Sequence, residues 1–399
     1  MFEKFRVGIM GTGKIATIMF ETIKQMRGVT VYAVGSRSEE SAMRFAKTYG
    51  VKKYYGSYEE LVSDPKVNLI YVATPHSEHF ANVKLALSAG KNVICEKAFM
   101  LNEAEAKEAF ALAEEKKLLL TEAMWTRYMP MVGKLKEVLA SNVIGEPTML
   151  TANLGYNIAY KDRINDPALG GGALLDLGVY VLNFASMVFG DDVADIASIC
   201  SYNDRGMDMQ DSITLRYRDG RMAVLNATAL SNSDRSGVIY GSKGYIVVEN
   251  INNPEAIAVY DSEYKKVAHY KRPNQISGYE YEIEACMKAI SENWLECPQM
   301  PHAVSLKMLS MMDFIRKNNN IYFPGEERTS SDLIPLPEQT EHVGSFESSG
   351  DVAAQEITDA SPDTEAALAG DETGEAAADG ALEGVETTAA SGSDLENNG

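Results

Sequence analysis

The regular alternation of short apolar runs with helical patterns is the feature that most restricts how this chain can fold. Apolar runs typical of buried strands lie at residues 5–10, 31–35, 69–73, 92–95 and 118–122, and helical patterns fill the segments between them. A parallel strand pair needs a crossover connection, which is usually a helix. The first third of the chain is therefore predicted to be an α/β domain with helices on both faces of its sheet.

Helix ends in this domain are predicted from residues that can satisfy free backbone groups. Side-chain oxygens able to accept bonds from a first helical turn stand at Ser38, Ser77 and Asn102. Glu39 and Glu40 follow the first of these and suit the positive end of a helix dipole. Gly50 is expected to end that helix.

The pattern changes after Trp125. One helix is predicted at about residues 128–139, and alternating strands follow, joined by turn signals at residues 218–221 (Arg-Asp-Gly-Arg) and 241–244 (Gly-Ser-Lys-Gly). Two helices, at about residues 279–293 and 302–317, are expected to pack on this sheet. We predict an α+β second domain and place the domains at residues 1–122 and 123–326.

Charge is spread unevenly between the body and the C-terminal segment. The 399-residue chain has a formal net charge of -20, from 57 acidic and 37 basic residues. The segment from Ser331 onward holds 17 of the acids and no lysine or arginine, which leaves 40 acids and a net charge of -3 in the rest. This near-neutral body gives no electrostatic case for binding nucleic acid or an anionic membrane. Residues 327–399 are predicted to be a disordered acidic tail.

The cysteines carry no recognisable framework. Cys95, Cys200, Cys286 and Cys297 are scattered without a C-x-x-C pair, so neither a metal site nor a set of disulfides is indicated. Free thiols fit a reducing compartment. The N-terminal stretch has no apolar run long enough for a signal peptide, and no stretch approaches the length of a membrane span. We expect a cytoplasmic protein.

A glycine-rich turn follows the first predicted strand. The sequence Gly11-Thr12-Gly13-Lys14-Ile15-Ala16 has the pattern G-x-G-x-x-A and opens a predicted helix. The first glycine permits a tight turn, the second lets the backbone approach a pyrophosphate, and the alanine allows close packing of helix on strand. The free N–H groups of the helix start would bind the phosphates. A plain turn is the alternative, but this strand–turn–helix context predicts a dinucleotide site in a Rossmann domain.

The end of the second predicted strand distinguishes between nicotinamide cofactors. A site for NAD usually has an Asp or Glu there for the ribose 2′-OH. This chain has Ser36 and Arg37 instead, and an arginine can pair with a 2′-phosphate. We therefore expect NADP rather than NAD. The alternative is that Arg37 simply begins a loop.

Further candidates follow the next strands. Ligands of open α/β sheets bind beyond the carboxyl ends of the strands. Glu96 and Lys97 follow the run at 92–95, and Thr74 and His76 follow the run before it. Charged side chains are rarely buried unless they are paired or functional. We predict that these four residues line the cofactor site near the nicotinamide.

A third candidate lies in the second domain. Three glycines at residues 170–172 precede an apolar helical pattern in which Asp176 and Tyr180 are spaced i,i+4 and share one helix face. An acid inside such a helix is unusual. The two residues are either a buried tyrosine bonded to a carboxylate or part of a catalytic group.

Four motifs together resemble the glucose–fructose oxidoreductase/inositol dehydrogenase (Gfo/Idh/MocA) family. They are the G-x-G-x-x-A turn, Ala-Thr-Pro-His at 73–76, Glu-Lys at 96–97, and Gly-Gly-Ala-Leu-Leu-Asp-Leu-Gly-Val-Tyr at 171–180. Glu-Ala-Met-Trp-Thr-Arg-Tyr at 122–128 is similar to the branch of dimeric dihydrodiol dehydrogenase and NADP-dependent xylose dehydrogenase. The resemblance covers about residues 3–325. The family pattern has a proline where this chain has Ala98.

The resemblance implies a Rossmann domain followed by a domain with an open, mostly antiparallel sheet, which commonly forms a dimer interface. It implies that Lys97 and Tyr180 are the catalytic pair and that Asp176 belongs to the substrate site. Many relatives carry His in place of the tyrosine, so its presence here favours the aldose and dihydrodiol branch over the inositol branch.

The resemblance also implies that Trp125 and Arg127 lie near the substrate. Tyr156 and Tyr160 would add flat apolar surface suited to the carbon face of a sugar. Ordinary packing between domains is an equally good interpretation of these two tyrosines.

Oxidation of an alcohol needs a hydride acceptor, here NADP, and a base for the hydroxyl proton. A free tyrosine ionises at a pKa of about 10, and the Lys97 ammonium is expected to favour the Tyr180 phenolate as the base. We predict an NADP-dependent oxidoreductase acting on a sugar-like alcohol, either C1 of an aldose or a trans-dihydrodiol. The alternatives are a glycosidase that retains its cofactor and a non-catalytic sensor of sugars or dinucleotides.

Overall fold

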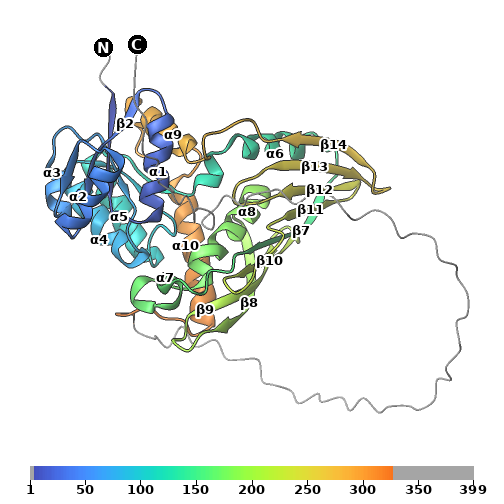
Figure 1. The fold of residues 1–399 in the computed structure, drawn as a ribbon. Coiled ribbons are helices and arrows are strands. Elements are labelled where there is room, and N and C mark those ends of the chain that lie inside the picture. The colour runs from blue at the N-terminus through green and yellow to red at the C-terminus, as the bar shows by residue number, and fades with distance from the viewer. Residues whose placement is uncertain (1–3, 327–399) are drawn as a thin grey trace, which may run out of the picture. The chain divides into compact units, whose positions relative to one another are not determined.

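A computed structural model describes residues 4–326 of the chain (Figure 1). The predicted acidic tail, residues 327–399, lies outside the described residues. The described part begins with a parallel sheet flanked by helices and continues into a large, mostly antiparallel sheet.

The first sheet has six parallel strands in the order β3-β2-β1-β4-β5-β6. Their bounds are β1 (Phe5–Met10), β2 (Val29–Gly35), β3 (Lys53–Tyr55), β4 (Leu69–Val72), β5 (Asn92–Glu96) and β6 (Leu120–Ala123). Five of them confirm the predicted apolar runs. The edge strand β3 is missing from the prediction, because its three residues are largely exposed and form no apolar run.

Helices cover this sheet and begin mostly where the sequence predicts. They are α1 (Lys14–Gln25), α2 (Glu39–Tyr49), α3 (Tyr58–Ser63), α4 (His76–Ser88) and α5 (Glu103–Lys116). The Ser38 side chain accepts a bond from the Ser41 N–H, and Asn102 caps α5 in the same way. The predicted cap at Ser77 is wrong: α4 begins one residue earlier, directly after Pro75, and has no side-chain cap.

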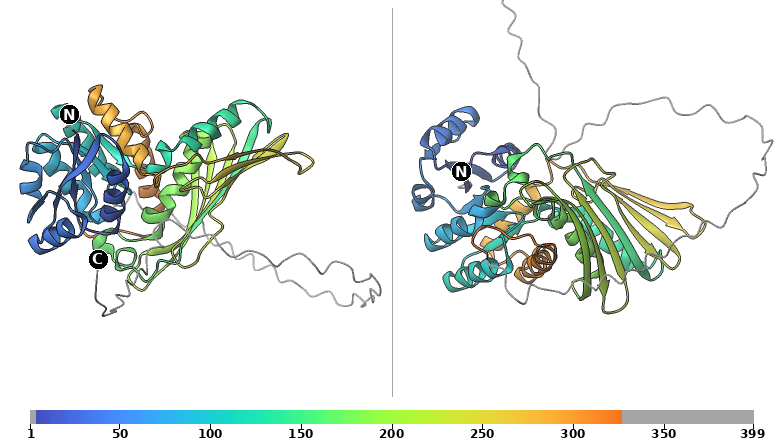
Figure 2. Two further views of the ribbon diagram at one scale, coloured as in Figure 1. Left: turned by 45° about the horizontal axis from the view of Figure 1, so that its top comes forward. Right: turned by 90° about the horizontal axis from the view of Figure 1, so that it is seen from below.

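The chain then passes through η1 (Trp125–Tyr128) and α6 (Pro130–Ala140) into an eight-stranded sheet, green and yellow in Figure 2. The strand order is β14-β13-β12-β11-β7-β10-β9-β8, and only the β7–β10 pair is parallel. The bounds are β7 (Pro147–Gly155), β8 (Val193–Tyr202), β9 (Asp208–Tyr217), β10 (Met222–Thr228), β11 (Gly237–Gly241), β12 (Gly244–Glu249), β13 (Ala256–Asp261) and β14 (Lys266–Lys271). Both predicted hairpin turns are confirmed, between β9 and β10 and between β11 and β12.

Between β7 and β8 the chain forms a short irregular stretch and then a buried helix. The elements are α7 (Asp162–Asn165), η2 (Pro167–Leu169), a π turn η3 (Leu174–Gly178) and α8 (Val179–Phe189). Contrary to the sequence expectation, the segment Pro167–Phe189 is long and apolar enough to cross a membrane by length and composition. However, 89% of its most apolar window is buried inside the fold. A core helix packed on β7 and β10 explains that composition.

The last two helices, α9 (Glu280–Ser291) and α10 (His302–Asn318), return toward the first sheet. The Ser305 hydroxyl of α10 donates to the Glu122 carboxyl of β6 at 2.7 Å, and Asp313 accepts a bond from the first N–H of α5 at 2.9 Å. At its other end, Asn319 donates to Ser198 of β8 at 2.9 Å. The predicted packing on the second sheet is confirmed for α10, which also bonds to β6 and so bridges the two sheets.

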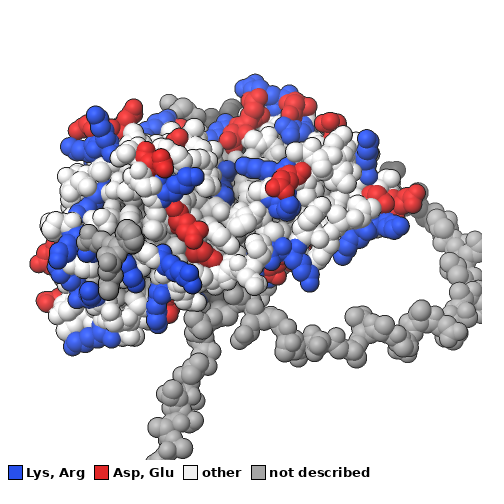
Figure 3. All heavy atoms as spheres, turned by 90° about the horizontal axis from the view of Figure 1, so that it is seen from above, with Lys and Arg blue, Asp and Glu red and all other residues white. Residues whose placement is uncertain are grey.

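Charged side chains of both signs are mixed on one face of the protein. On the face shown in Figure 3, lysine and arginine side chains alternate with aspartate and glutamate side chains over both sheets. This face therefore carries no extended field of one sign, in keeping with the near-neutral composition of the body.

Candidate active site

The glycine-rich turn between β1 and α1 forms an open cradle. Gly11 has a φ of +114°, and a Cβ there would lie 2.5 Å from the Ala73 carbonyl oxygen, so only glycine fits. Gly13 stands at the start of α1, and a Cβ on it would meet nothing within 4 Å. Ala16 is fully buried, which lets the helix pack on the sheet. The open space at Gly13, beside the free N–H groups of α1, fits a dinucleotide pyrophosphate.

The remaining residues of the cradle, Thr12, Lys14 and Ile15, are partly or fully exposed at the same helix start. At the end of β2, Ser36 is nearly buried, whereas the Arg37 side chain is 71% exposed. The Arg37 guanidinium lies 3.9 Å from the carboxylate of Glu78 on α4. Arg37 can therefore reach a 2′-phosphate, but Glu78 competes for it.

Lys97 stands directly after β5 and reaches across to the second domain. Its ammonium donates to the Asp176 backbone oxygen at 2.9 Å and to Asp176 Oδ1 at 3.1 Å. Arg163 of α7 donates to the same Oδ1 at 2.6 Å. Burial alone would raise the pKa of Asp176, but Lys97 and Arg163 outweigh it and hold that pKa well below its usual range. The Lys97–Ala98 peptide bond is cis.

Tyr180 lies against this charged group. The Lys97 Nζ is 4.9 Å from the centre of the Tyr180 ring, and the Trp125 indole donates to the Tyr180 hydroxyl at 3.0 Å. Trp125 in turn stacks on Tyr279, with ring centres 4.1 Å apart and planes 9° apart. The structure thus brings Lys97, Asp176, Tyr180 and Trp125, here called the Lys97 cluster, together from three separate segments: the end of β5, η1 and the continuous helical stretch of η3 and α8.

The π turn η3 presents Asp176 and then leads into α8, which carries Tyr180. Within it, the Val179 N–H bonds to the carbonyl oxygen of Leu174, five residues back. Gly172 precedes the turn with a φ of +105°, and the carboxyl of Asp208 lies where its Cβ would be. Asp208 also accepts a bond from the Leu174 N–H at 2.5 Å. Single π turns inside helices often mark functional sites.

Two of the residues predicted to line the cofactor site bond to the Lys97 turn. His76 lies within hydrogen-bonding distance of the Gly170 and Lys97 carbonyl oxygens, at 2.9 and 3.2 Å, and burial lowers its pKa from 6.5 to about 3. The Glu96 carboxylate accepts bonds from the Tyr71 hydroxyl and from the Lys97 N–H. The third, Thr74, accepts a bond from Asn82 of α4 at its Oγ1, at 3.0 Å. Contacts of these three residues with the cofactor stay a prediction.

Arg127 bonds to α8, and its predicted place near the substrate stays a prediction. Its guanidinium donates to Asn183 at 2.5 Å and to Ser186 at 2.6 Å, both on α8. It therefore anchors η1, and with it Trp125, against α8.

The two candidate tyrosines differ in their surroundings. Tyr160 is 75% exposed. Within residues 4–326, no contact is seen between it and the Lys97 cluster. The Tyr156 hydroxyl donates to Asn252 at 3.2 Å, and the Asn252 backbone oxygen accepts a bond from Thr126, next to Trp125. Tyr156 is thus linked to the cluster through η1, whereas Tyr160 is not.

Arg163 and Tyr279 are absent from the sequence-predicted site. Arg163 stands in a polar stretch, Lys-Asp-Arg-Ile-Asn-Asp, in which no spacing singles it out. Tyr279 lies about 150 residues beyond Trp125 and begins a helical pattern like any other. Only the folded structure brings these residues to Asp176 and Trp125.

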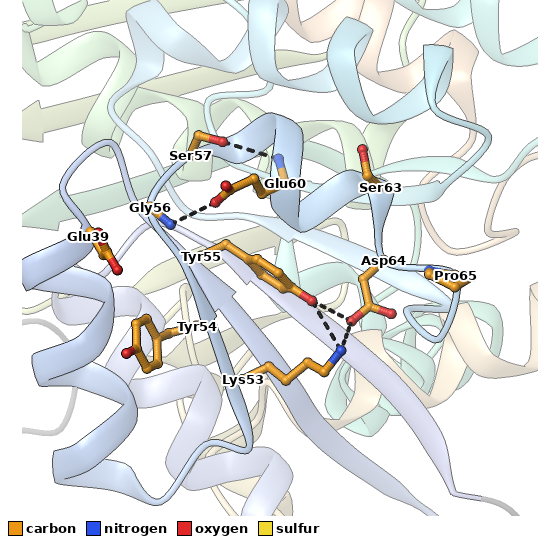
Figure 4. A pocket seen from close by; sticks show the side chains of 10 residues that line it. All are labelled: Glu39, Lys53, Tyr54, Tyr55, Gly56, Ser57, Glu60, Ser63, Asp64 and Pro65. Carbon is orange, nitrogen blue, oxygen red and sulfur yellow. Dashed lines mark hydrogen bonds and ion pairs between the residues drawn. The ribbon is translucent and has the colours of Figure 1, made fainter.

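A separate groove lies at the outer edge of β3 (Figure 4). In it, Lys53 and Tyr55 point toward Asp64, with bonds of 3.1 and 2.6 Å to the same carboxylate oxygen. None of its lining residues belongs to the Lys97 cluster. These three side chains satisfy one another's hydrogen-bonding groups. The Lys97 cluster is therefore the better candidate active site.

Comparisons with known proteins agree on the family. Residues 5–124 match the GFO/IDH/MocA oxidoreductase family, NAD-binding Rossmann fold, and residues 132–247 match the GFO/IDH/MocA C-terminal domain. The chain is 32% identical over 325 residues to trans-1,2-dihydrobenzene-1,2-diol dehydrogenase of Xenopus tropicalis, covering 79% of this chain and 98% of the relative. It is 34% identical over 305 residues to the enzyme of that name from Oryctolagus cuniculus, covering 74% and 92%.

Among solved structures, a 3-ketoreductase from Actinomadura kijaniata in complex with NADP and TDP-benzene superposes with a TM-score of 0.73 at 25% identity. The match covers 79% of this chain and 97% of that one. The two matched domains and the nearly full-length relatives place the protein: it is a dehydrogenase that belongs to the GFO/IDH/MocA oxidoreductase family, in the dihydrodiol dehydrogenase branch.

Proposed function

We propose that the protein is an NADP-dependent dehydrogenase that oxidises a hydroxyl group of a sugar-like alcohol, either a trans-dihydrodiol or C1 of an aldose. The observation that carries the proposal is the convergence of Lys97, Asp176, Tyr180 and Trp125 at the carboxyl end of β5. Relatives named for trans-1,2-dihydrobenzene-1,2-diol support the substrate class.

NADP would be held by the Gly11–Ala16 cradle and by Arg37, and when bound it supplies the hydride acceptor. Tyr180 is the proposed base for the hydroxyl proton. The Lys97 ammonium, 4.9 Å from its ring, favours the phenolate. Base catalysis by a positioned side chain is typically worth about 10²–10⁴ in rate.

Trp125 fixes the tyrosine. Its indole N–H donates to the Tyr180 oxygen, and such a donor stabilises the phenolate more than the neutral phenol. Stacking on Tyr279 and anchoring of η1 by Arg127 leave the indole little freedom. Trp125 and Tyr180 are 2% and 7% exposed, so little bulk water reaches the proposed base.

The preference for NADP over NAD rests on Arg37 and Ser36 at the end of β2. Neither residue is a carboxylate, and Arg37 has no acceptor for a ribose 2′-OH, whereas both residues can donate to a 2′-phosphate. The complex of the Actinomadura kijaniata 3-ketoreductase with NADP supports the same preference.

We also propose that the second sheet joins two copies of this chain. Its outer face carries Ile199, Met222 and Tyr240, which are 71, 40 and 38% exposed. Met222 and Tyr240 both pair with Met149 of β7, so three large side chains form one row across three strands. Apolar side chains so placed favour burial in an interface. Light scattering of the purified protein at micromolar concentration should give the mass of a dimer.

The function is tested by NADP+ reduction followed at 340 nm with trans-dihydrodiols, pentoses, hexoses and inositols. At least one dihydrodiol or aldose should be oxidised, and Tyr180→Phe should lose the activity. The matched control is Tyr217→Phe, because Tyr217 is equally buried but packs on Phe189, away from the cluster. Absence of NADP+ reduction with every class of alcohol would refute the proposal.

A further inference from the structure

Asp176 is shared between two cations, and the reaction proposed above uses only one of them. Its Oδ1 accepts from Lys97 at 3.1 Å and from Arg163 at 2.6 Å. The Asp176 side chain is 4% exposed and that of Lys97 is 12% exposed, whereas that of Arg163 is 37% exposed. Arg163 thus approaches the carboxylate from the solvent side, and Lys97 approaches it from the side of Tyr180.

The Asp176 carboxylate faces both cations. In a pair of Lys97 and Asp176 alone, the carboxylate would offset the charge of Lys97 in full and would give little reason for Tyr180 to ionise. Because the carboxylate also binds Arg163, it offsets less of the Lys97 charge beside the tyrosine ring. A positive charge within about 4–6 Å favours an ionised phenol.

Other titratable groups surround the cluster, and the nearest carboxylate, that of Glu96, bonds to the Tyr71 hydroxyl and the Lys97 N–H. His76 is neutral, since its pKa falls to about 3, and His79 is buried with its pKa lowered by the same desolvation. Burial raises the pKa of Glu122, which bonds to Ser305, to about 7. Behind η3, burial raises the pKa values of Asp208 and Asp211, so this pair resists full ionisation.

The loop between β7 and η3 holds Arg163 in place. α7 is a single turn, and the Ile164 carbonyl accepts a bond from the Gly172 N–H at 2.9 Å, which ties this turn to the start of η3. The Asn165 side chain donates to the Ala159 and Lys161 carbonyls and closes the loop on itself. Arg163 therefore meets Asp176 through a folded loop rather than through a chance surface contact.

We propose that Arg163 is a positioning residue for the proton-transfer step: by holding the Asp176 carboxylate, it leaves the charge of Lys97 available to Tyr180. The inference rests on the proposed function, because the charge of Lys97 matters for proton transfer only if Tyr180 is the base. Arg163 need not touch the substrate for this role.

The test is the titration of Tyr180 in the full-length protein, read by ¹³C NMR after labelling the tyrosine ring carbon that bears the hydroxyl. The chain has 20 tyrosines, so the Tyr180 signal is assigned by its loss in Tyr180→Phe. In Arg163→Met the midpoint should rise by about 1 pH unit, the lower end of the range for a close charge because Arg163 is partly exposed. Arg163→Lys should restore most of the shift.

Arg205→Met is the matched control, because Arg205 pairs with Asp166 of the same loop at 3.5 Å and is 62% exposed. Its Tyr180 midpoint should equal that of the unmodified protein. Arg163→Gln provides a second neutral variant if Arg163→Met does not fold. An unchanged midpoint in a folded neutral variant would overturn the inference.

Kinetics distinguish this failure from failure of the proposed function. For any alcohol that the unmodified protein oxidises, the rise of kcat/KM with pH should move upward in Arg163→Met by the same amount as the NMR midpoint. A higher KM with an unmoved profile would make Arg163 a substrate contact and refute the inference. If no alcohol is oxidised while the NMR midpoint still moves, the proposed function fails and the charge coupling stands.

Discussion

Tyr180→Phe and Lys97→Met, made singly and together, test whether the two residues form one catalytic unit. Tyr180→Phe removes the proton acceptor and keeps the ring that packs beside Lys97. Lys97→Met keeps most of the side-chain length and removes the charge and its bonds to Asp176. Each single change should lower kcat by about 10²-fold or more. The double variant should be little worse than either, since effects within a catalytic unit are not additive.

The size of the charge effect follows from the geometry. Two unit charges separated by the 4.9 Å between Nζ and the ring centre interact by about 3 kcal/mol at an effective dielectric constant of 20. That energy corresponds to a shift of about 2 pH units. Asp176 offsets part of it, so the rise of oxidation rate with pH should move upward by about 1–2 units in Lys97→Met.

The assays are NADP+ reduction at 340 nm across pH and cofactor titration by quenching of intrinsic fluorescence. Cofactor binding should survive Tyr180→Phe nearly unchanged, because the cradle and Arg37 lie on other segments. Turnover that persists in Tyr180→Phe with an unchanged pH profile would refute the assignment of the base. Additive losses in the double variant would show that Lys97 and Tyr180 act independently.

Four further changes test the cofactor site and the core beneath it. Arg37→Ala should weaken NADP binding by about 10-fold or more, with little effect on NAD binding. Glu78→Gln should strengthen NADP binding by up to about fivefold, because it frees the exposed Arg37 guanidinium from its ion pair. Fluorescence titration measures both effects. Gly13→Val should weaken NADP binding by about 10-fold or more while leaving the thermal midpoint nearly unchanged, because its Cβ meets nothing within 4 Å. Burial raises the pKa of Glu122 from 4.5 to about 7, so between these pH values the folded state retains a proton that the unfolded state loses, and stability should fall as pH rises. Glu122→Gln should flatten that slope in urea unfolding curves measured across the same pH range.

The first sheet could be predicted from the sequence because its strands are buried on both faces and read as continuous apolar runs. β1, for example, matches the predicted run at both ends, whereas the exposed edge strand β3 leaves no such run. Ser77 shows the limit of reading caps from residue type alone. A serine can cap a helix, but here Pro75 sets the start of α4 one residue before it.

The division into domains at residue 122 stays a prediction. The first matched family segment, 5–124, ends two residues beyond it, and the second begins at residue 132. However, α10 bonds to Glu122 and to the start of α5 as well as to Ser198 of the second sheet. A helix that packs on both α5 and β8 carries one amphipathic pattern, and that pattern does not say how many partners the helix has.

Two rules of local order single out Lys97, Asp176 and Tyr180, and the family resemblance implies their catalytic roles. Lys97 follows from the position of ligands beyond parallel strands, and Asp176 and Tyr180 follow from their spacing on one helix. No such rule applies to Arg127, whose side chain turns toward α8. Its placement near the substrate came from resemblance, which transfers a residue's neighbourhood but not the direction of its side chain.

The π turn at Leu174–Gly178 explains why even a correct spacing argument left the chemistry open. Residues four apart lie on one face in an α-helix and in a wider turn alike, so the sequence could not reveal that the Asp176 backbone oxygen also accepts from Lys97. With that bond, the lysine is held by main chain and carboxylate together, and the carboxylate is shared with Arg163. The number of cations that share the Asp176 carboxylate decides how much of the Lys97 charge it offsets beside Tyr180. That number depends on a loop fold that residue spacing does not encode, so the reactivity of the tyrosine could only be inferred from the structure.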